Sequence, residues 1–209
     1  NDFIFKLPYG QSSYADLIFD LFHTIIAHDY DIFDENLALS FSQQIQFSPI
    51  KSLVLIANYG EHIDRISNPW DMIDLLFSNR KRFIVRETVI QYISLLSYLC
   101  LHKENFRNER SIHSFDSISD LLTQKDPEVI NTAYGALISI TRVNSKCQNP
   151  KYAKKISIQS VISHLQSKDE VLIFNALSFL LIYEIDDDEL LQQLIKMKNQ
   201  RASLVLMKY

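Results

Sequence analysis

Histidine is the side chain best suited to acid–base catalysis near neutral pH, and the chain contains six of them. None belongs to a His-Glu-x-x-His pair, which would place two imidazoles on one helix face to bind zinc. His23 and His28 are five residues apart, a spacing that turns their side chains away from each other on a helix. We therefore expect no catalytic role for His23, His28, His62, His102, His113 or His164.

Serine and cysteine nucleophiles need neighbours that activate them, and the sequence supplies none nearby. No serine occupies a Gly-x-Ser-x-Gly elbow, and Cys100 and Cys147 have no local partner that would lower a thiol pKa. Two cysteines cannot form a disulfide framework or a four-ligand zinc site. Acidic neighbours such as Asp34 and Glu35 are adjacent, so their side chains diverge. We expect no catalytic residue, no metal site and no cofactor, and hence no enzyme.

Three charged segments could bind ions or nucleic acid. Residues 80–82 with Arg86 could grip a phosphate or an acidic peptide, but we favour a solvated turn. Residues 151–155 are basic around Tyr152, yet no ladder of aromatic residues interleaves with the charges, and the net charge is −4. The acidic run 184–189 lacks the glycine and spaced ligands of a calcium loop and suits the start of a helix. We expect neither nucleic acid nor calcium as a partner.

Glycine is scarce, with only Gly10, Gly60 and Gly135 in the chain. Phosphate-binding loops and tight β-hairpins depend on glycine, so this count favours helices joined by ordinary turns. No stretch approaches the roughly 20 apolar residues of a membrane span. The first residues lack the order of a signal peptide, in which charge precedes an apolar core. The chain also lacks an initiator Met, which predicts a fragment of a longer protein. We expect an intracellular protein, in the cytoplasm with the nucleus as an alternative, and no membrane partner.

Proline and apolar periodicity predict an all-α fold. Four prolines follow a Ser, Asn or Asp, the arrangement of an N-cap residue before the first residue of a helix, as in Asp126-Pro127. Apolar residues recur at three- and four-residue spacing, as from Tyr14 to Ile26. The predicted helices are 13–28, 34–45, 49–59, 69–79, 82–101, 114–124, 127–143, 156–167, 169–184, 187–197 and 199–208.

The sequence also repeats itself. Asp126 and Asp169 each follow a short apolar helix, and Ala133 and Ala176 lie at the same offset of 43 residues. An earlier copy begins at Trp70. A period in the low forties built from two or more helices is typical of a solenoid. In this alignment His164 falls where the neighbouring copy has Leu121, which predicts a buried or half-buried packing residue.

This order of segments resembles the armadillo repeat family. The segments are 95–100, ending a long third helix; 103–107, a short first helix; 117–122, a second helix ending in Leu-Leu; and the capped third helix from 126. The resemblance implies a right-handed α–α superhelix of about four repeats over 45–185, one α-solenoid over 1–209. Residues 1–44 would be a degenerate repeat or a cap, and 186–209 a partial repeat. The related HEAT repeat is the alternative.

The resemblance further implies a concave groove, lined by third helices, that binds an extended peptide or a helix of a partner protein. Small residues would let the helices approach closely: Ala57, Ala133, Gly135, Ala136 and Ala176. The polar residues on the third helices would line the groove: Asn58, Arg86, Ser94, Tyr98, Asn131, Ser139, Arg142 and Asn175.

The sequence therefore predicts a protein-binding scaffold or adaptor. One alternative is a regulatory or substrate-recognition segment of a larger enzyme, such as a kinase or a ubiquitin ligase. A third is a nuclear-import adaptor of the importin-alpha type, which the sequence disfavours. Such adaptors carry a ladder of Trp and Asn residues in the groove. Here the residue four positions before Asn58 is Val54, where that ladder requires Trp, and Trp70 lies at the start of a predicted second helix.

Overall fold

A computed structural model describes residues 69–148, 156–183, 185, 187–197 and 199–208, together with the exposed helical residues Asp20, Thr24 and His28. Within these residues the structure contains α-helices, short 3₁₀ helices and no β-strand, which confirms the all-α fold class. The elements are α4 (Pro69–Asn79), η4 (Arg80–Arg82), α5 (Arg86–His102), α6 (Glu104–Ser119), η5 (Asp120–Thr123), α7 (Pro127–Val143), η6 (Ser145–Gln148), α8 (Ile158–Leu165), α9 (Glu170–Leu180), α10 (Asp188–Lys196) and α11 (Gln200–Leu206). Of the three helices predicted before residue 69, 13–28 is described only at Asp20, Thr24 and His28, which are helical, while 34–45 and 49–59 lie outside the described residues.

The repeated caps act as the sequence predicts. The Asp126 carboxylate accepts from the backbone N–H groups of Glu128 and Val129, at 2.9 and 3.4 Å, and Pro127 is the first residue of α7. The Asp169 carboxylate accepts from the second and third N–H groups of α9 at 2.9 and 3.1 Å. Asp187, from the acidic run, accepts from Leu190 N–H at 2.9 Å and caps α10. These bonds satisfy donors that have no partner inside the helix, so they define where each helix begins.

Two predicted helices begin in the wrong place. The helix predicted at 82 begins at Arg86, because the chain leaves the helical path after η4 and buries Phe83 against Tyr92, with ring centroids 5.3 Å apart. The helix predicted at 114–124 is instead α6, continuous from Glu104 and followed by η5. The short first helix expected at 103–107 is thus the first part of α6.

The start of α6 was not predicted from apolar periodicity, because several of its buried residues are serines. Ser111, Ser114 and Ser117 are buried on the same helix as Phe106 and Phe115, so its buried stripe does not read as apolar in the sequence. Small hydroxyl side chains occupy little volume at a helix contact, and we infer that they let neighbouring elements pack close to α6. The other helices predicted from residue 69 onward agree with the structure to within a few residues at each end.

The chain divides into two compact units, residues 1–92 and 93–209. In the described part of the first unit, Tyr92 packs its ring against Phe77 and Phe83, at centroid distances of 6.4 and 5.3 Å. All three side chains are buried. They form a small aromatic core among α4, the turn after it and the start of α5.

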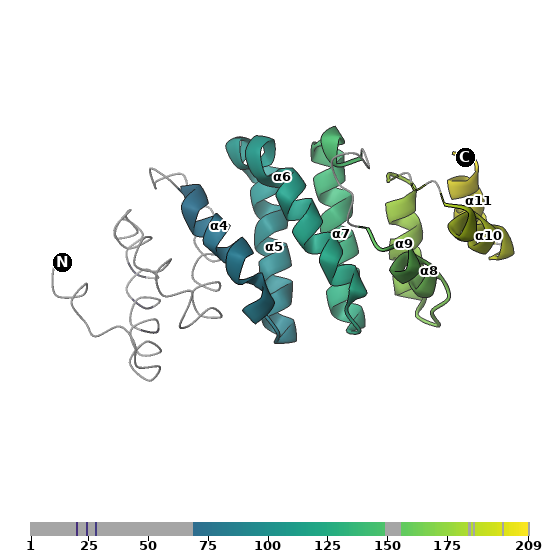
Figure 1. Cartoon of the computed structure of the whole chain (residues 1–209), viewed down its shortest axis with the longest axis horizontal. Helices are drawn as coiled ribbons and strands as arrows, with labels where there is room; N and C mark the ends of the chain where they lie inside the picture. The colour runs from purple at the N-terminus through teal and green to yellow at the C-terminus, as the bar shows by residue number, and fades with distance from the viewer. Residues whose placement is uncertain are drawn as a thin grey trace. The chain divides into compact units, whose positions relative to one another are not determined.

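The second unit is a stack of helix pairs in two layers. The pairs α6–α7, α8–α9 and α10–α11 follow one another (Figure 1). In one layer α9 contacts α7 and α11, and in the other α8 contacts η5 and α10. The space between the layers is filled by buried aromatic residues, including Phe115, Tyr134, Phe179 and Tyr183.

Small residues bring α7 and α9 together, with one correction. Ala133, Ala136 and Ala176 are buried, as the sequence predicts. Gly135 is exposed, and a methyl group added to it would meet nothing within 4 Å, so it does not serve a close helix contact. Helical periodicity explains the difference, because Gly135 lies about 100° around α7 from Ala136. Ala57 lies outside the described residues.

Candidate functional site

The candidate site is the outward face of the α7–α9–α11 layer, meaning the side chains of these helices that point away from the α8–α10 layer. On α7 this face includes exposed Gly135 and Arg142 and half-buried Ser139. On α9 it includes the exposed side chains of Val171 and Phe174. The face combines polar groups with large apolar groups, a composition suited to contact with another protein.

Side chains connect the three helices across this face. Asn175 Nδ2 on α9 donates to Asn131 Oδ1 on α7 at 3.0 Å, and both residues are half-buried. Arg201 on α11 donates from Nη1 to Ser178 Oγ on α9. Each helix of the layer is therefore tied to the next by a hydrogen bond, which fixes the relative positions of the side chains on this face.

A pocket of about 600 Å³ lies between α9 and α11. Ile173, Phe174 and Leu177 form its apolar side, and the Arg201 guanidinium carbon lies 3.7 Å from the centre of the Phe174 ring. The cation–π contact holds the arginine over an aromatic ring that is still 49% exposed. The remaining lining comes from Glu170, Asn199 and Gln200.

Among the predicted groove residues, the structure brings Asn131 and Asn175 into direct contact. Ser139 lies on the same face but bonds to its own helix, with Oγ donating to Gly135 O at 2.9 Å. Arg142 is exposed in the last turn of α7. These four residues belong to the α7–α9 part of the face.

The other predicted groove residues in the described ranges lie on α5. Arg86 is exposed and pairs with Glu87 at 3.2 Å. Ser94 is exposed on α5, whereas Tyr98 is half-buried with its ring 4.6 Å from that of His102. Asn58 lies outside the described residues.

Phe174 and Arg201, which form the pocket, were missed by the sequence reasoning. A signal was present for Phe174, because it lies four residues from both Glu170 and Ser178, on the polar side of an otherwise apolar helix. An apolar residue at such a position is exposed unless another element covers it. Arg201 offered no comparable signal, since its partners lie 23 and 27 residues earlier in the chain.

His164 is buried, as its alignment with Leu121 predicts. Its Nδ1 lies 2.8 Å from Tyr134 Oη. Burial lowers the pKa of His164 and raises that of Tyr134, so a neutral phenol and a neutral imidazole share this hydrogen bond at neutral pH. This pair joins α7 to α8 inside the protein.

The thiols are also enclosed. Burial raises the pKa of Cys100 to about 12 and that of Cys147 to about 11, so neither is a thiolate nucleophile at neutral pH. Arg107 donates to the carbonyl oxygens of Cys100 and Leu101, at 3.0 and 3.1 Å, and so caps the end of α5. These polar groups serve the packing of the second unit.

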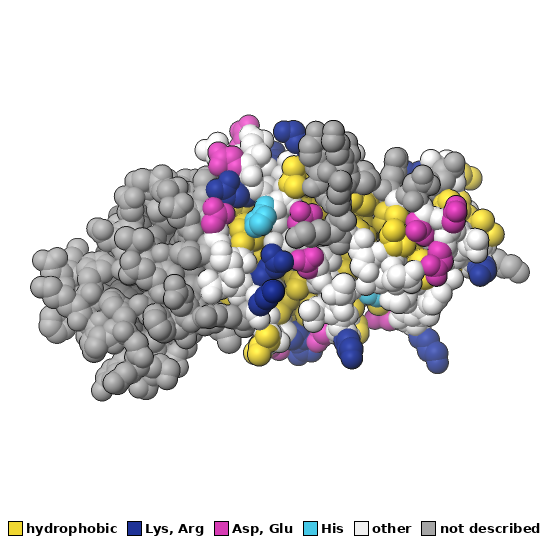
Figure 2. Space-filling view, in the orientation of Figure 1, with side chains coloured by type: hydrophobic (Ala, Val, Ile, Leu, Met, Phe, Trp, Pro, Cys, Tyr) yellow, Lys and Arg dark blue, Asp and Glu magenta, His cyan; other side chains and the backbone are white. Residues whose placement is uncertain are grey.

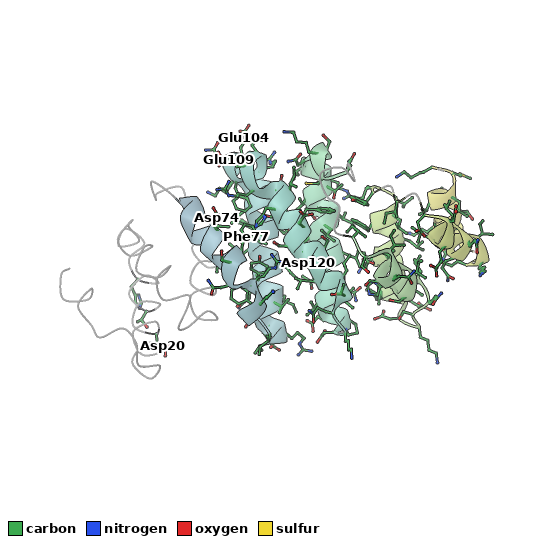
Figure 3. The ribbon with its side chains drawn as sticks, in the orientation of Figure 1. Asp20, Asp74, Phe77, Glu104, Glu109 and Asp120 are labelled. Atoms are coloured by element: carbon green, nitrogen blue, oxygen red, sulfur yellow. The ribbon has the colours of Figure 1, made fainter. Side chains whose placement is uncertain are left out.

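Acidic residues do not gather into a metal site in the part of the chain that the structure describes. Figure 3 shows Glu104 and Glu109 near the start of α6, apart from Asp120 in η5. Figure 2 shows acidic, basic and hydrophobic side chains interspersed over the described part of the visible face. Residues 80–82 form the turn η4, with Lys81 exposed. Across the described ranges, no helix has the length and apolar character that crossing a membrane requires.

The chain matches no known family model, no curated protein and no solved structure.

Proposed function

We propose that this chain is a protein-binding scaffold whose outward α7–α9–α11 face holds a peptide or a helix of a partner protein. The observation that carries the proposal is Phe174, a half-exposed aromatic side chain that lines a pocket and is held in place by Arg201. Aromatic and arginine side chains are the residues that most often dominate the energy of protein interfaces.

The proposal includes an armadillo-like superhelix, in which this layer is the concave side. The two-layer stack of helix pairs and the repeated Asp caps on α7 and α9 support it. In such an arrangement successive helices of one layer present a continuous surface to an elongated ligand. The hydrogen bonds from Asn175 to Asn131 and from Arg201 to Ser178 would keep that surface rigid, which lowers the entropy cost of binding.

Site-specific photo-crosslinking in the source cell tests this function. A photoreactive amino acid replaces Arg142, exposed on α7, or Gln192, exposed on α10 in the other layer. We expect a discrete crosslinked protein from position 142 and none from position 192. Crosslinks from position 192 alone would move the interface to the other layer. If neither position yields a crosslinked protein, the scaffold function is wrong.

A further inference from the structure

The α9–α11 pocket has walls of opposite charge. Glu170 comes from the first turn of α9, and Arg201 from the first turn of α11. Neither forms an ion pair with another described residue, so both charges remain available to a ligand. Ile173, Phe174 and Leu177 lie between them as an apolar floor. A ligand that fills this pocket must therefore present an apolar group together with charge.

The volume fits a large side chain rather than a whole domain. A pocket of about 600 Å³ lies within the range of about 300–1,000 Å³ that is typical of small-ligand sites. It can accept an aromatic or branched side chain with part of the neighbouring backbone. The amide side chains of Asn199 and Gln200 at its edge can bond to that backbone.

The charge of Arg201 favours a ligand that carries an acidic group beside its apolar side chain. Asn199, Gln200 and Arg201 line the pocket on the α11 side, and the charged side chain among them is the basic Arg201. The Arg201 guanidinium carbon lies 3.7 Å from the centre of the Phe174 ring, and Nη1 donates to Ser178 Oγ. A guanidinium carries five N–H donors in one plane, so N–H groups remain that can pair with a carboxylate.

We propose that the α9–α11 pocket binds a peptide segment in which an aromatic or large aliphatic side chain stands next to an Asp or Glu. The apolar side chain lies on Phe174 and Leu177, and the carboxylate pairs with Arg201. Glu170 on the opposite wall repels a carboxylate, so it orients the acidic residue toward α11. This inference rests on the proposed scaffold function and defines the chemistry of its ligand.

Selection from a displayed library of random peptides of about 12 residues tests the proposal on the full chain. Selected peptides should be enriched in an aromatic or large aliphatic residue beside Asp or Glu. Their affinity should fall about tenfold or more in Arg201→Glu, and should rise severalfold in Glu170→Lys, because the two changes act on opposite walls. Lys125→Glu makes the same charge change as Arg201→Glu at an exposed position outside the pocket and should leave affinity unchanged.

A conservative variant separates the site from a folding defect. Arg201→Lys keeps the charge but loses the planar set of N–H donors that a guanidinium offers a carboxylate, so it should weaken the same peptides severalfold while thermal unfolding stays close to wild type. Selected peptides without that pairing, or with equal affinity for wild type and a folded Arg201→Glu protein, would overturn this inference and leave the scaffold function standing. A library that yields no binding peptide would overturn both.

Discussion

Asn175 on α9 donates a hydrogen bond to Asn131 on α7, across 44 residues of sequence. The bond joins two side chains that the sequence independently places among the groove residues. It also lies on the face that we propose as the binding surface. The same bond therefore joins two helices of the layer and fixes the positions of two side chains at the proposed site.

Replacing these two asparagines tests their coupling. We expect Asn131→Ala and Asn175→Ala each to lower the free energy of unfolding by about 0.5–1.5 kcal/mol, the net value of a typical hydrogen bond. The double variant should lose less than the sum of the two, because only one bond exists to be broken. Chemical denaturation of the four proteins measures this coupling, and strict additivity would show that the bond contributes nothing.

Gly135→Ala should stabilise the protein. The glycine lies inside α7 with free space around it, and alanine is favoured over glycine in a helix interior by about 0.5–1 kcal/mol. The midpoint of urea unfolding should therefore rise. A fall in this midpoint would mean that the position is crowded.

The contrast between Gly135 and Ala136 tests the orientation of α7. Ala136→Asp should abolish cooperative unfolding, since Ala136 is 6% exposed and the change buries an unpaired carboxylate. Gly135→Asp introduces the same carboxylate on the exposed side of α7, so this variant should remain folded. Circular dichroism during heating distinguishes them, and similar melting of both variants would show that the helix is rotated from this orientation.

The two aspartate caps should have equal effects. Asp126→Ala and Asp169→Ala each leave two N–H groups of a helix without their acceptor, so each should cost about 1 kcal/mol. Asn at either position keeps an acceptor oxygen and should cost much less. Unfolding titrations of the four variants measure this. A cost confined to one of the two Ala variants would show that these positions are not structural equivalents.

His164 makes stability depend on pH. Its pKa in the folded protein is lowered from 6.5 by burial, so the unfolded chain binds the proton more readily. The stabilisation is therefore present above the unfolded pKa of about 6.5 and is lost as the pH falls below it toward the folded pKa.

The denaturant concentration at the midpoint of unfolding should consequently decrease when the pH is lowered from about 7.5 to about 5.5. In the double variant Tyr134→Phe, His164→Leu, which removes both hydrogen-bonding partners, this pH dependence should be smaller. An unchanged slope would contradict neutral burial of His164.

Local rules in the sequence predicted the helix starts that depend on a cap, such as those of α7 and α9, because an Asp accepts from N–H groups two and three residues away. They failed at α6, where buried serines hide the apolar stripe. They also failed for Arg201, because its stack on Phe174 depends on how two helices pack rather than on either helix alone. The asparagines of the candidate site on α7 and α9 were therefore predictable, and the spacing of Phe174 from Glu170 and Ser178 carried a signal for it, whereas Arg201 was not predictable.

The most direct test of the scaffold function compares two exposed apolar side chains on opposite layers. Phe174 is 49% exposed on α9, and Ile195 is 65% exposed on α10. A fluorescent peptide taken from the crosslinked partner is titrated against Phe174→Ala and Ile195→Ala, with fluorescence anisotropy as the readout. We predict an affinity loss of about tenfold or more for Phe174→Ala, as expected for a buried interface anchor, and no change for Ile195→Ala. Equal affinity of both variants, or loss only in Ile195→Ala, would contradict binding on the α7–α9–α11 face.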